Sequence, residues 1–167
     1  EVIEEMEKIK EMPNILKTSL IKLSGALAHN LAKITPGTLK NTFFCNSGAE
    51  AVEGALKTAR ISTGKTGLIS CEGSFHGKTL GALSVTGRTK YQEPFKPLIP
   101  ECSLVPFGDL DLLEKELAKG DIAAFIVEPI QGEGGVIVPP NGYLKGAREL
   151  CTKYGALLIV DEIQTGL

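Results

Sequence analysis

The spacing of apolar residues divides the chain into a helical beginning and a longer alternating part. Apolar positions about one helical turn apart predict a helix over 2–12 and another over 16–33. The sequence ITPG at 34–37 is typical of a helix end. We therefore separate a helical segment, residues 1–38, from the remainder, residues 39–167.

In the remainder, short apolar runs alternate with amphipathic runs of helical period. The apolar runs predict strands at 41–46, 66–71, 102–107, 122–129 and 156–162. The amphipathic runs predict helices at 47–62, 77–87, 109–120 and 143–155, with loops at 94–100 and 131–142. Strands that alternate with helices predict an α/β fold, with a mostly parallel sheet and helices on both faces.

Composition and charge narrow the choice of partner. The net charge is −2 and no long run has one sign, which argues against nucleic acid or an anionic membrane as the main partner. No apolar stretch approaches the roughly 20 residues that span a bilayer, and the acidic first residues do not resemble a signal peptide. Four widely spaced cysteines and two histidines favour reduced thiols and no zinc site. We therefore expect a cytoplasmic protein.

Polar or aromatic residues follow four of the predicted strands. In chain order they are Asn46, Ser47 and Gly48; Ser74, Phe75 and His76; Glu128; and Asp161. Because the carboxyl ends of parallel strands lie at one edge of a sheet, where ligands bind, we expect these residues to converge.

The residues from Ser47 to Glu50 have two compatible interpretations. At the start of a helix, the N–H groups of Gly48 and Ala49 can bind a phosphate together with the Ser47 hydroxyl. Ser47, with Glu50 three residues later, equally matches a helix-capping box.

Two further residues at this edge match a flat, nitrogen-containing ligand. Phe75 can stack on a planar ring, although it could instead pack under its loop beside a solvated His76. Asp161, after an apolar strand, stays ionised only with a partner such as a protonated ring nitrogen, and Gln164 could bind the same ligand. With the phosphate cradle, these residues describe a site for pyridoxal 5'-phosphate, which acts as an electron sink when its nitrogen is protonated.

Glu128 and Glu133 leave simpler alternatives open. Glu128 ends a strand and is held extended by the proline that follows it, and Glu133 lies in a glycine-rich loop. By themselves, they are interpreted as a hydrogen-bonding acid and a solvated one.

Four segments resemble one enzyme family. They are FFCNSGAEAVEGALKTAR, GSFHGKTLGALSVTG, VEPIQGEGGVIVPPNGYL and GALLIVDEIQTGL, and they resemble class III (ornithine-type, subgroup II) pyridoxal-phosphate aminotransferases. The resemblance runs from about Leu39 to the last residue. The segments FFCNSG, KPLIP and VPFGD look most like putrescine aminotransferases, although acetylornithine, ornithine and 4-aminobutyrate enzymes share the site motifs.

The resemblance implies residues that would hold the phosphate and the ring. Ser47, Gly48 and Ala49 would bind the phosphate, and Ala49 stands where many relatives have Thr. Phe75 would stack on one face of the ring, and Ile163 would pack against the other.

It also implies polar contacts around the ring. Asp161 would pair with the pyridinium nitrogen, with His76 beside the ring, and Gln164 would contact the phenolic oxygen. Glu128 would support the site. Glu133 matches an acid that, in ornithine-type relatives, holds a substrate-gating Arg from a small domain outside this chain.

The resemblance implies a homodimeric transaminase that moves an amino group from a diamine or ω-amino donor to a 2-oxo acid. Such enzymes need a Lys bonded covalently to the cofactor. No matching motif occurs here, since Lys33, Lys57, Lys65 and Lys78 fit nothing in that role. We therefore expect residues 39–167 to be the N-terminal part of a cofactor-binding large domain that is inactive alone.

Two other functions are weighed against this one. A hydrolase with Ser47 as its nucleophile lacks the G-x-S-x-G pattern, because Cys45 and Ala49 stand where glycines belong, and its acids follow His76. A non-catalytic binding fragment remains a serious alternative for the chain as it stands.

Overall fold

The computed structural model describes residues 3–4, 7 and 22–166, and the chain forms two compact units, Glu1–Phe44 and Cys45–Leu167. In the first unit, α2 spans Lys22–Ile34. It ends where Thr35 donates its N–H to the Leu31 carbonyl, directly before a proline that cannot continue the helix. The first half of the predicted helix 16–33 lies outside the described residues. Of the predicted helix 2–12, residues 3, 4 and 7 are described, and they are helical.

The strand predicted at 41–46 is wrong. These residues form no strand, and Phe43 and Phe44 are 79% and 45% exposed. A strand requires a neighbour to complete its ladder of hydrogen bonds, and no described residue pairs with this segment.

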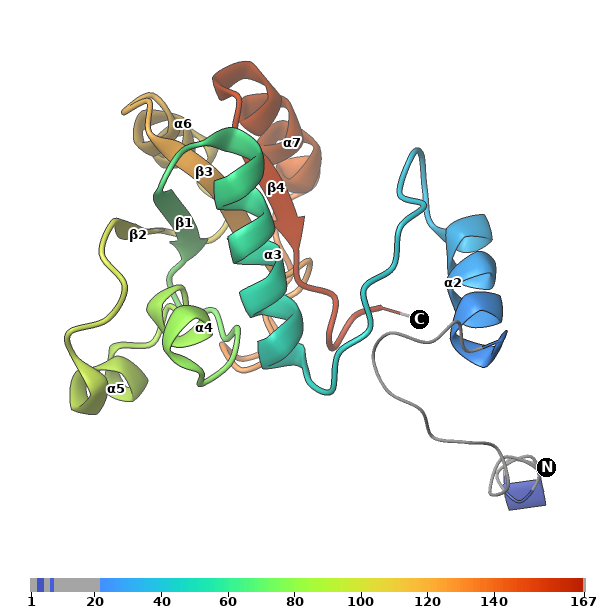
Figure 1. Ribbon diagram of the computed structural model, residues 1–167. Coiled ribbons are helices and arrows are strands. Elements are labelled where there is room, and N and C mark those ends of the chain that lie inside the picture. The colour runs from blue at the N-terminus through green and yellow to red at the C-terminus, as the bar shows by residue number, and fades with distance from the viewer. Residues whose placement is uncertain (1–2, 5–6, 8–21, 167) are drawn as a thin grey trace. The chain divides into compact units, whose positions relative to one another are not determined.

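The second unit contains a parallel sheet, as the alternating pattern predicted (Figure 1). Its strands are β1 (Gly67–Cys71), β2 (Cys102–Val105), β3 (Ile122–Val127) and β4 (Leu157–Val160). They lie in the order β2-β1-β3-β4, and every neighbouring pair is parallel. The carboxyl ends of all these strands therefore lie at one edge of the sheet.

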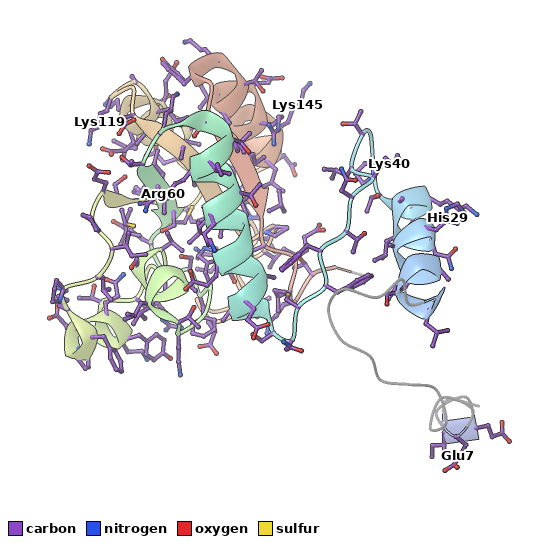
Figure 2. The ribbon with its side chains drawn as sticks, in the orientation of Figure 1. Glu7, His29, Lys40, Arg60, Lys119 and Lys145 are labelled. Atoms are coloured by element: carbon purple, nitrogen blue, oxygen red, sulfur yellow. The ribbon has the colours of Figure 1, made fainter. Side chains whose placement is uncertain are left out.

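Helices cover both faces of this sheet. On one face, α3 (Gly48–Thr63) and α4 (Leu80–Ser84) pack against apolar side chains of β1 and β3. On the other face, α6 (Leu110–Leu117) and α7 (Tyr143–Tyr154) enclose the larger apolar cluster. Figure 2 shows the side chains between these layers, while Lys119 and Lys145 lie at the outer surface. The α/β prediction with two covered faces is confirmed.

The segment between β1 and β2 differs from its prediction. The helix predicted at 77–87 is reduced to α4. Glu53 of α3 accepts hydrogen bonds from two N–H groups at the start of α4, Gly81 N (2.9 Å) and Ala82 N (3.2 Å), and from the Thr79 hydroxyl (2.6 Å). A short helix, α5 (Thr89–Gln92), and a 3-10 turn, η1 (Glu93–Phe95), precede the loop that follows. Within the described part of the chain, no helix is long and apolar enough to cross a bilayer.

Candidate functional site

A pocket of about 150 Å³ opens at the carboxyl edge of the sheet. It is lined by Phe75, Glu128, Ile130, Glu133, Asp161, Ile163, Gln164 and Thr165. Residues that follow β1, β3 and β4 thus meet in one place, although the chain separates them by many residues. Six of the residues singled out from the sequence lie in this lining.

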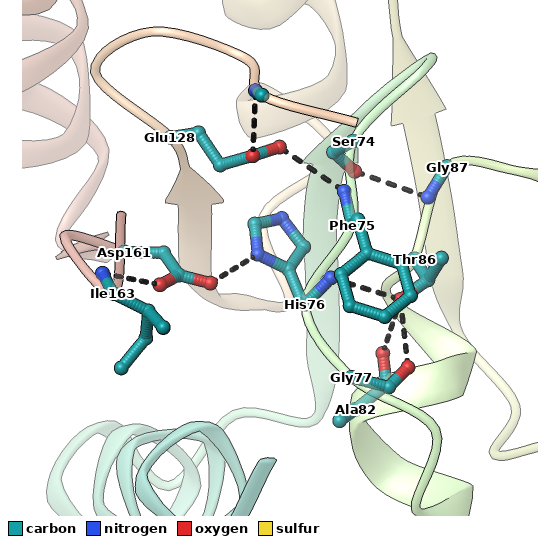
Figure 3. Close-up of polar contacts among 11 residues, drawn as sticks. Ser74, Phe75, His76, Gly77, Ala82, Thr86, Gly87, Glu128, Asp161 and Ile163 are labelled. Carbon is teal, nitrogen blue, oxygen red and sulfur yellow. Dashed lines mark hydrogen bonds and ion pairs between the residues drawn. The ribbon is translucent and has the colours of Figure 1, made fainter. Parts of the chain in front are cut away.

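Asp161 and His76 form a buried pair at the pocket (Figure 3). His76 Nδ1 lies 2.7 Å from Asp161 Oδ2, and the two side chains are 0% and 6% exposed. Asp161 Oδ1 accepts a further hydrogen bond from Ile163 N at 3.2 Å. Thr86 fixes the His76 backbone by accepting from its N–H at 3.1 Å. A solvated His76, which the sequence left open, is therefore wrong.

This pairing sets the hydrogen-bonding capacity of the imidazole. With Nδ1–H donating to the Asp161 carboxylate, Nε2 of a neutral His76 can act only as an acceptor. That atom is buried and has no partner among the described residues. His76 thus holds the Asp161 carboxylate through a hydrogen bond from behind the pocket wall.

Glu128 joins two loops of the pocket. Its Oε2 accepts from Phe75 N at 3.0 Å and its Oε1 from Gly132 N at 3.3 Å, and the residue is nearly buried. Two backbone donors stabilise the carboxylate and hold the loop after β1 against the loop after β3. The simpler interpretation of Glu128, as a hydrogen-bonding acid, is therefore confirmed.

Glu133 has a partner that the sequence reasoning missed. Arg88 Nη1 lies 3.2 Å from Glu133 Oε2 and also donates to the Glu133 backbone carbonyl. Arg88 lies in the segment between β1 and β2, where nothing in its sequence context marked it. Tyr91 was missed for the same reason, and its ring forms a T-shaped pair with the Phe75 ring at a centroid distance of 6.0 Å.

The start of α3 adjoins the pocket without lining it. Ser47 caps the helix by accepting from Glu50 N at 3.2 Å, and the first N–H groups, of Gly48 and Ala49, have no acceptor within the helix. A Cβ at Gly48 would lie 3.0 Å from Cγ1 of Ile163, so the backbone approaches this pocket residue closely. Among the described residues no hydrogen bond joins Ser47 to a histidine, so the base that a serine hydrolase needs is not in place.

The ionisable side chains that line the pocket are all of one kind. The ionisable residues in its lining are all acids: Glu128, Glu133 and Asp161. With one aromatic wall at Phe75 and an aliphatic one at Ile163, such a pocket suits a flat ligand with a positively charged nitrogen. In the part of the chain that the structure describes, no group of three or more potential ligand side chains is placed to hold a metal ion.

Comparison with known proteins identifies a family. A family model described as aminotransferase class-III matches residues 5–167. Aminotransferase PigE from Serratia sp. (strain ATCC 39006) is 50% identical over 156 residues, which cover 93% of this chain and 18% of that protein.

Solved structures agree in fold. The chain resembles the ornithine aminotransferase of Toxoplasma gondii, with partial occupancy of PLP at the active site, at a TM-score of 0.88 and 35% identity. It resembles the taurine:2-oxoglutarate aminotransferase of Bifidobacterium kashiwanohense, in complex with PLP and glutamate, at a TM-score of 0.91 and 30% identity. Each match covers 99% of this chain and 41% or 42% of the other, so the chain spans well under half of these relatives.

Proposed function

Because the chain belongs to the class-III aminotransferase family, we propose that it is part of a pyridoxal-phosphate-dependent transaminase. Residues 39–167 would form the N-terminal part of the cofactor-binding large domain, and residues 1–38 a helical segment before it. When bound, pyridoxal 5'-phosphate supplies the electron sink for amino-group transfer. The residues of this chain would bind and orient that group.

The observation that carries this proposal is the buried Asp161–His76 pair. A carboxylate that is 6% exposed, at the end of a pocket with only acidic ionisable groups, favours a ligand nitrogen that stays protonated. His76 holds the carboxylate by Nδ1 at 2.7 Å, so Asp161 meets the ring nitrogen without having to reorganise. Asp161 would thus be the catalytic contact, and His76 the residue that positions it.

The remaining residues would hold the ring and the phosphate. Phe75 and Ile163, which lie on either side of the His76 ring in the view of Figure 3, would pack on the two faces of the cofactor ring. Ser47, Gly48 and Ala49 would bind the phosphate through the start of α3, which the close contact between Gly48 and Ile163 supports.

Three further residues would complete the lining. Gln164 would contact the phenolic oxygen of the cofactor, and Glu128 would keep the Phe75 loop in place through its backbone hydrogen bond. Glu133 would face the incoming substrate and control its access.

For the whole protein we propose amino-group transfer from a diamine or ω-amino donor, putrescine-like, to a 2-oxo acid. The motifs FFCNSG, KPLIP and VPFGD support this donor class, and an acidic pocket is compatible with a dication. Acetylornithine, ornithine and 4-aminobutyrate are the alternative donors. A cytoplasmic homodimer is part of this proposal, and this chain by itself would bind cofactor without turning over substrate.

The test of cofactor binding uses pyridoxamine 5'-phosphate, which has the ring nitrogen and phosphate but no aldehyde to react with surface lysines. Titrated into the chain, it should shift the amide NMR signals of Gly48, Ala49 and Ile163. Asp161→Asn should weaken binding about tenfold or more, the effect of losing a charge-assisted hydrogen bond. Lys96→Ala, which removes an exposed ion pair, is the matched control and should change nothing. Binding that leaves these three signals unmoved would contradict the proposal.

The donor is tested in a complete protein that carries these residues. Putrescine should support transamination of a 2-oxo acid with a higher kcat/KM than acetylornithine, ornithine or 4-aminobutyrate. A preference for one of those amino acids would reassign the donor and leave the class of reaction unchanged.

A further inference from the structure

The rim of the pocket carries an ion pair that bridges two loops. Arg88 Nη1 lies 3.2 Å from Glu133 Oε2, and the two side chains are 24% and 50% exposed. The Arg88 backbone starts from a fixed point, because Gly87 exchanges hydrogen bonds with Gly73 and Ser74 at 2.8 and 3.0 Å. The guanidinium therefore reaches Glu133 from a rigid base.

Arg88 belongs to a cluster of cations outside the acidic pocket. Lys78 Nζ, Lys90 Nζ and Arg88 Cζ lie 5.0, 4.9 and 5.7 Å from the centre of the Tyr91 ring. Of these three, in the described contacts, only Arg88 touches an acid of the pocket lining. The rim is thus positive outside and negative inside, and the Arg88–Glu133 pair joins the two regions.

The three acids of the lining differ in how firmly their partners are held. Asp161 is bonded to His76 inside the protein, and Glu128 accepts from two backbone N–H groups. Glu133 is instead paired with the long, partly exposed side chain of Arg88. Ion pairs exposed to this degree are weak and are screened by salt, so an entering cation can displace Arg88.

We propose that Arg88 is a specificity-determining residue, which competes with the distal ammonium of the amine donor for the Glu133 carboxylate. The inference rests on the proposed function, from which it takes the donor class. With Arg88 in place, the Glu133 charge is neutralised at the rim. When the ammonium of a diamine replaces it, the guanidinium turns toward solvent.

The competition for Glu133 is measured by diamine binding alone, without cofactor or turnover. A negative result would therefore reject the role of Arg88 and leave the proposed transaminase function untouched. The probe is 1,4-diaminobutane, titrated into the chain and followed by the amide NMR signals of Gly132, Glu133 and Gly134. Arg88→Ala should tighten its binding about threefold to fivefold, the range set by an exposed ion pair. The neutral probe 1,4-butanediol should bind equally to both proteins.

Three further variants separate competition from a general change in charge or folding. Lys90→Ala removes a cation from the same Tyr91 ring without touching Glu133, and it should not reproduce the gain. Arg88→Lys keeps a competing cation and should return the affinity toward that of the wild type. Arg88→Ala should give no gain in a Glu133→Gln background. Unchanged affinity in Arg88→Ala, or an equal gain in Lys90→Ala, would overturn the proposal.

In a complete protein, Arg88→Ala should change the KM values of the diamine and of the 2-oxo acid differently. Arg88→Ala should lower KM for the diamine and leave KM for the 2-oxo acid unchanged or higher. A merely structural role for Arg88 would instead raise both KM values as the loop around Glu133 loosens.

Discussion

Replacing Asp161 tests the buried pair on which the site depends. Asp161→Ala removes the acceptor of His76 Nδ1 and leaves both ring nitrogens without partners, since Nε2 has none among the described residues already. Asp161→Asn keeps the shape of the side chain and an oxygen that can accept from Nδ1. The two substitutions therefore separate the loss of the charge from the loss of the hydrogen bond.

The burial of the two side chains determines how much stability each substitution should remove. The two side chains are 0% and 6% exposed, so water cannot replace the lost bond. A hydrogen bond to a charged group contributes about 1.5–3 kcal/mol, and a neutral one about 1 kcal/mol. We expect Asp161→Ala to lower the free energy of unfolding by about 2–3 kcal/mol and Asp161→Asn by about 1 kcal/mol. For a chain of this size, the larger loss lowers Tm by roughly 4–12 °C.

Thermal and urea unfolding, followed by circular dichroism, measure both values. Glu93→Ala is the control, because it breaks an ion pair whose side chains are more than half exposed and should lower stability by less than about 1 kcal/mol. If Asp161→Ala is as stable as the wild type or Glu93→Ala, the His76–Asp161 bond does not form in solution. In a complete enzyme Asp161→Ala should abolish turnover, and near-normal activity would refute the assignment of Asp161 to the ring nitrogen.

Two other predictions concern packing and pH. Gly77→Ala places a Cβ 2.9 Å from that of Ala49 at a φ of +127°, so urea unfolding should show a loss of about 1–3 kcal/mol. Gly25→Ala, where a Cβ meets no described residue within 4 Å, should be neutral or slightly stabilising. Burial raises the pKa of the Cys71 thiol from 9.0 to about 12. Its contribution to stability is complete below pH 9 and is lost as pH rises toward 12, so Tm should fall in that window and less steeply in Cys71→Ala.

The pattern of apolar residues determined most of the fold. β3 is buried at each of its positions, as its unbroken apolar run predicts for a strand covered on both faces. Helix ends followed local chemistry as well, since α6 starts at its cap Asp109 and α7 ends before Gly155, whose φ is +62°. These features depend on neighbours along the chain, so they could be predicted from it.

The failed strand at 41–46 marks the limit of such reasoning. Phe43 and Phe44 have the apolar character of a strand, but the pattern does not say whether another strand lies beside them. Pairing is a property of the tertiary arrangement. Likewise, nothing local predicted α5, which lies between the predicted helix 77–87 and the predicted loop 94–100.

The candidate site, too, could be predicted from the sequence only in part. The rule that parallel strands end at one edge is topological, and it sufficed to predict that Phe75, Glu128 and Asp161 would lie together. The pairs themselves were decided only in three dimensions. His76 and Asp161 are 85 positions apart, and Arg88 and Glu133 are 45 apart. Hydrogen bonds and ion pairs form only where the loops bring donor and acceptor atoms to about 3 Å from each other. The sequence by itself determined the kinds of residue at the edge of the sheet, and the tertiary structure decided which of them bond.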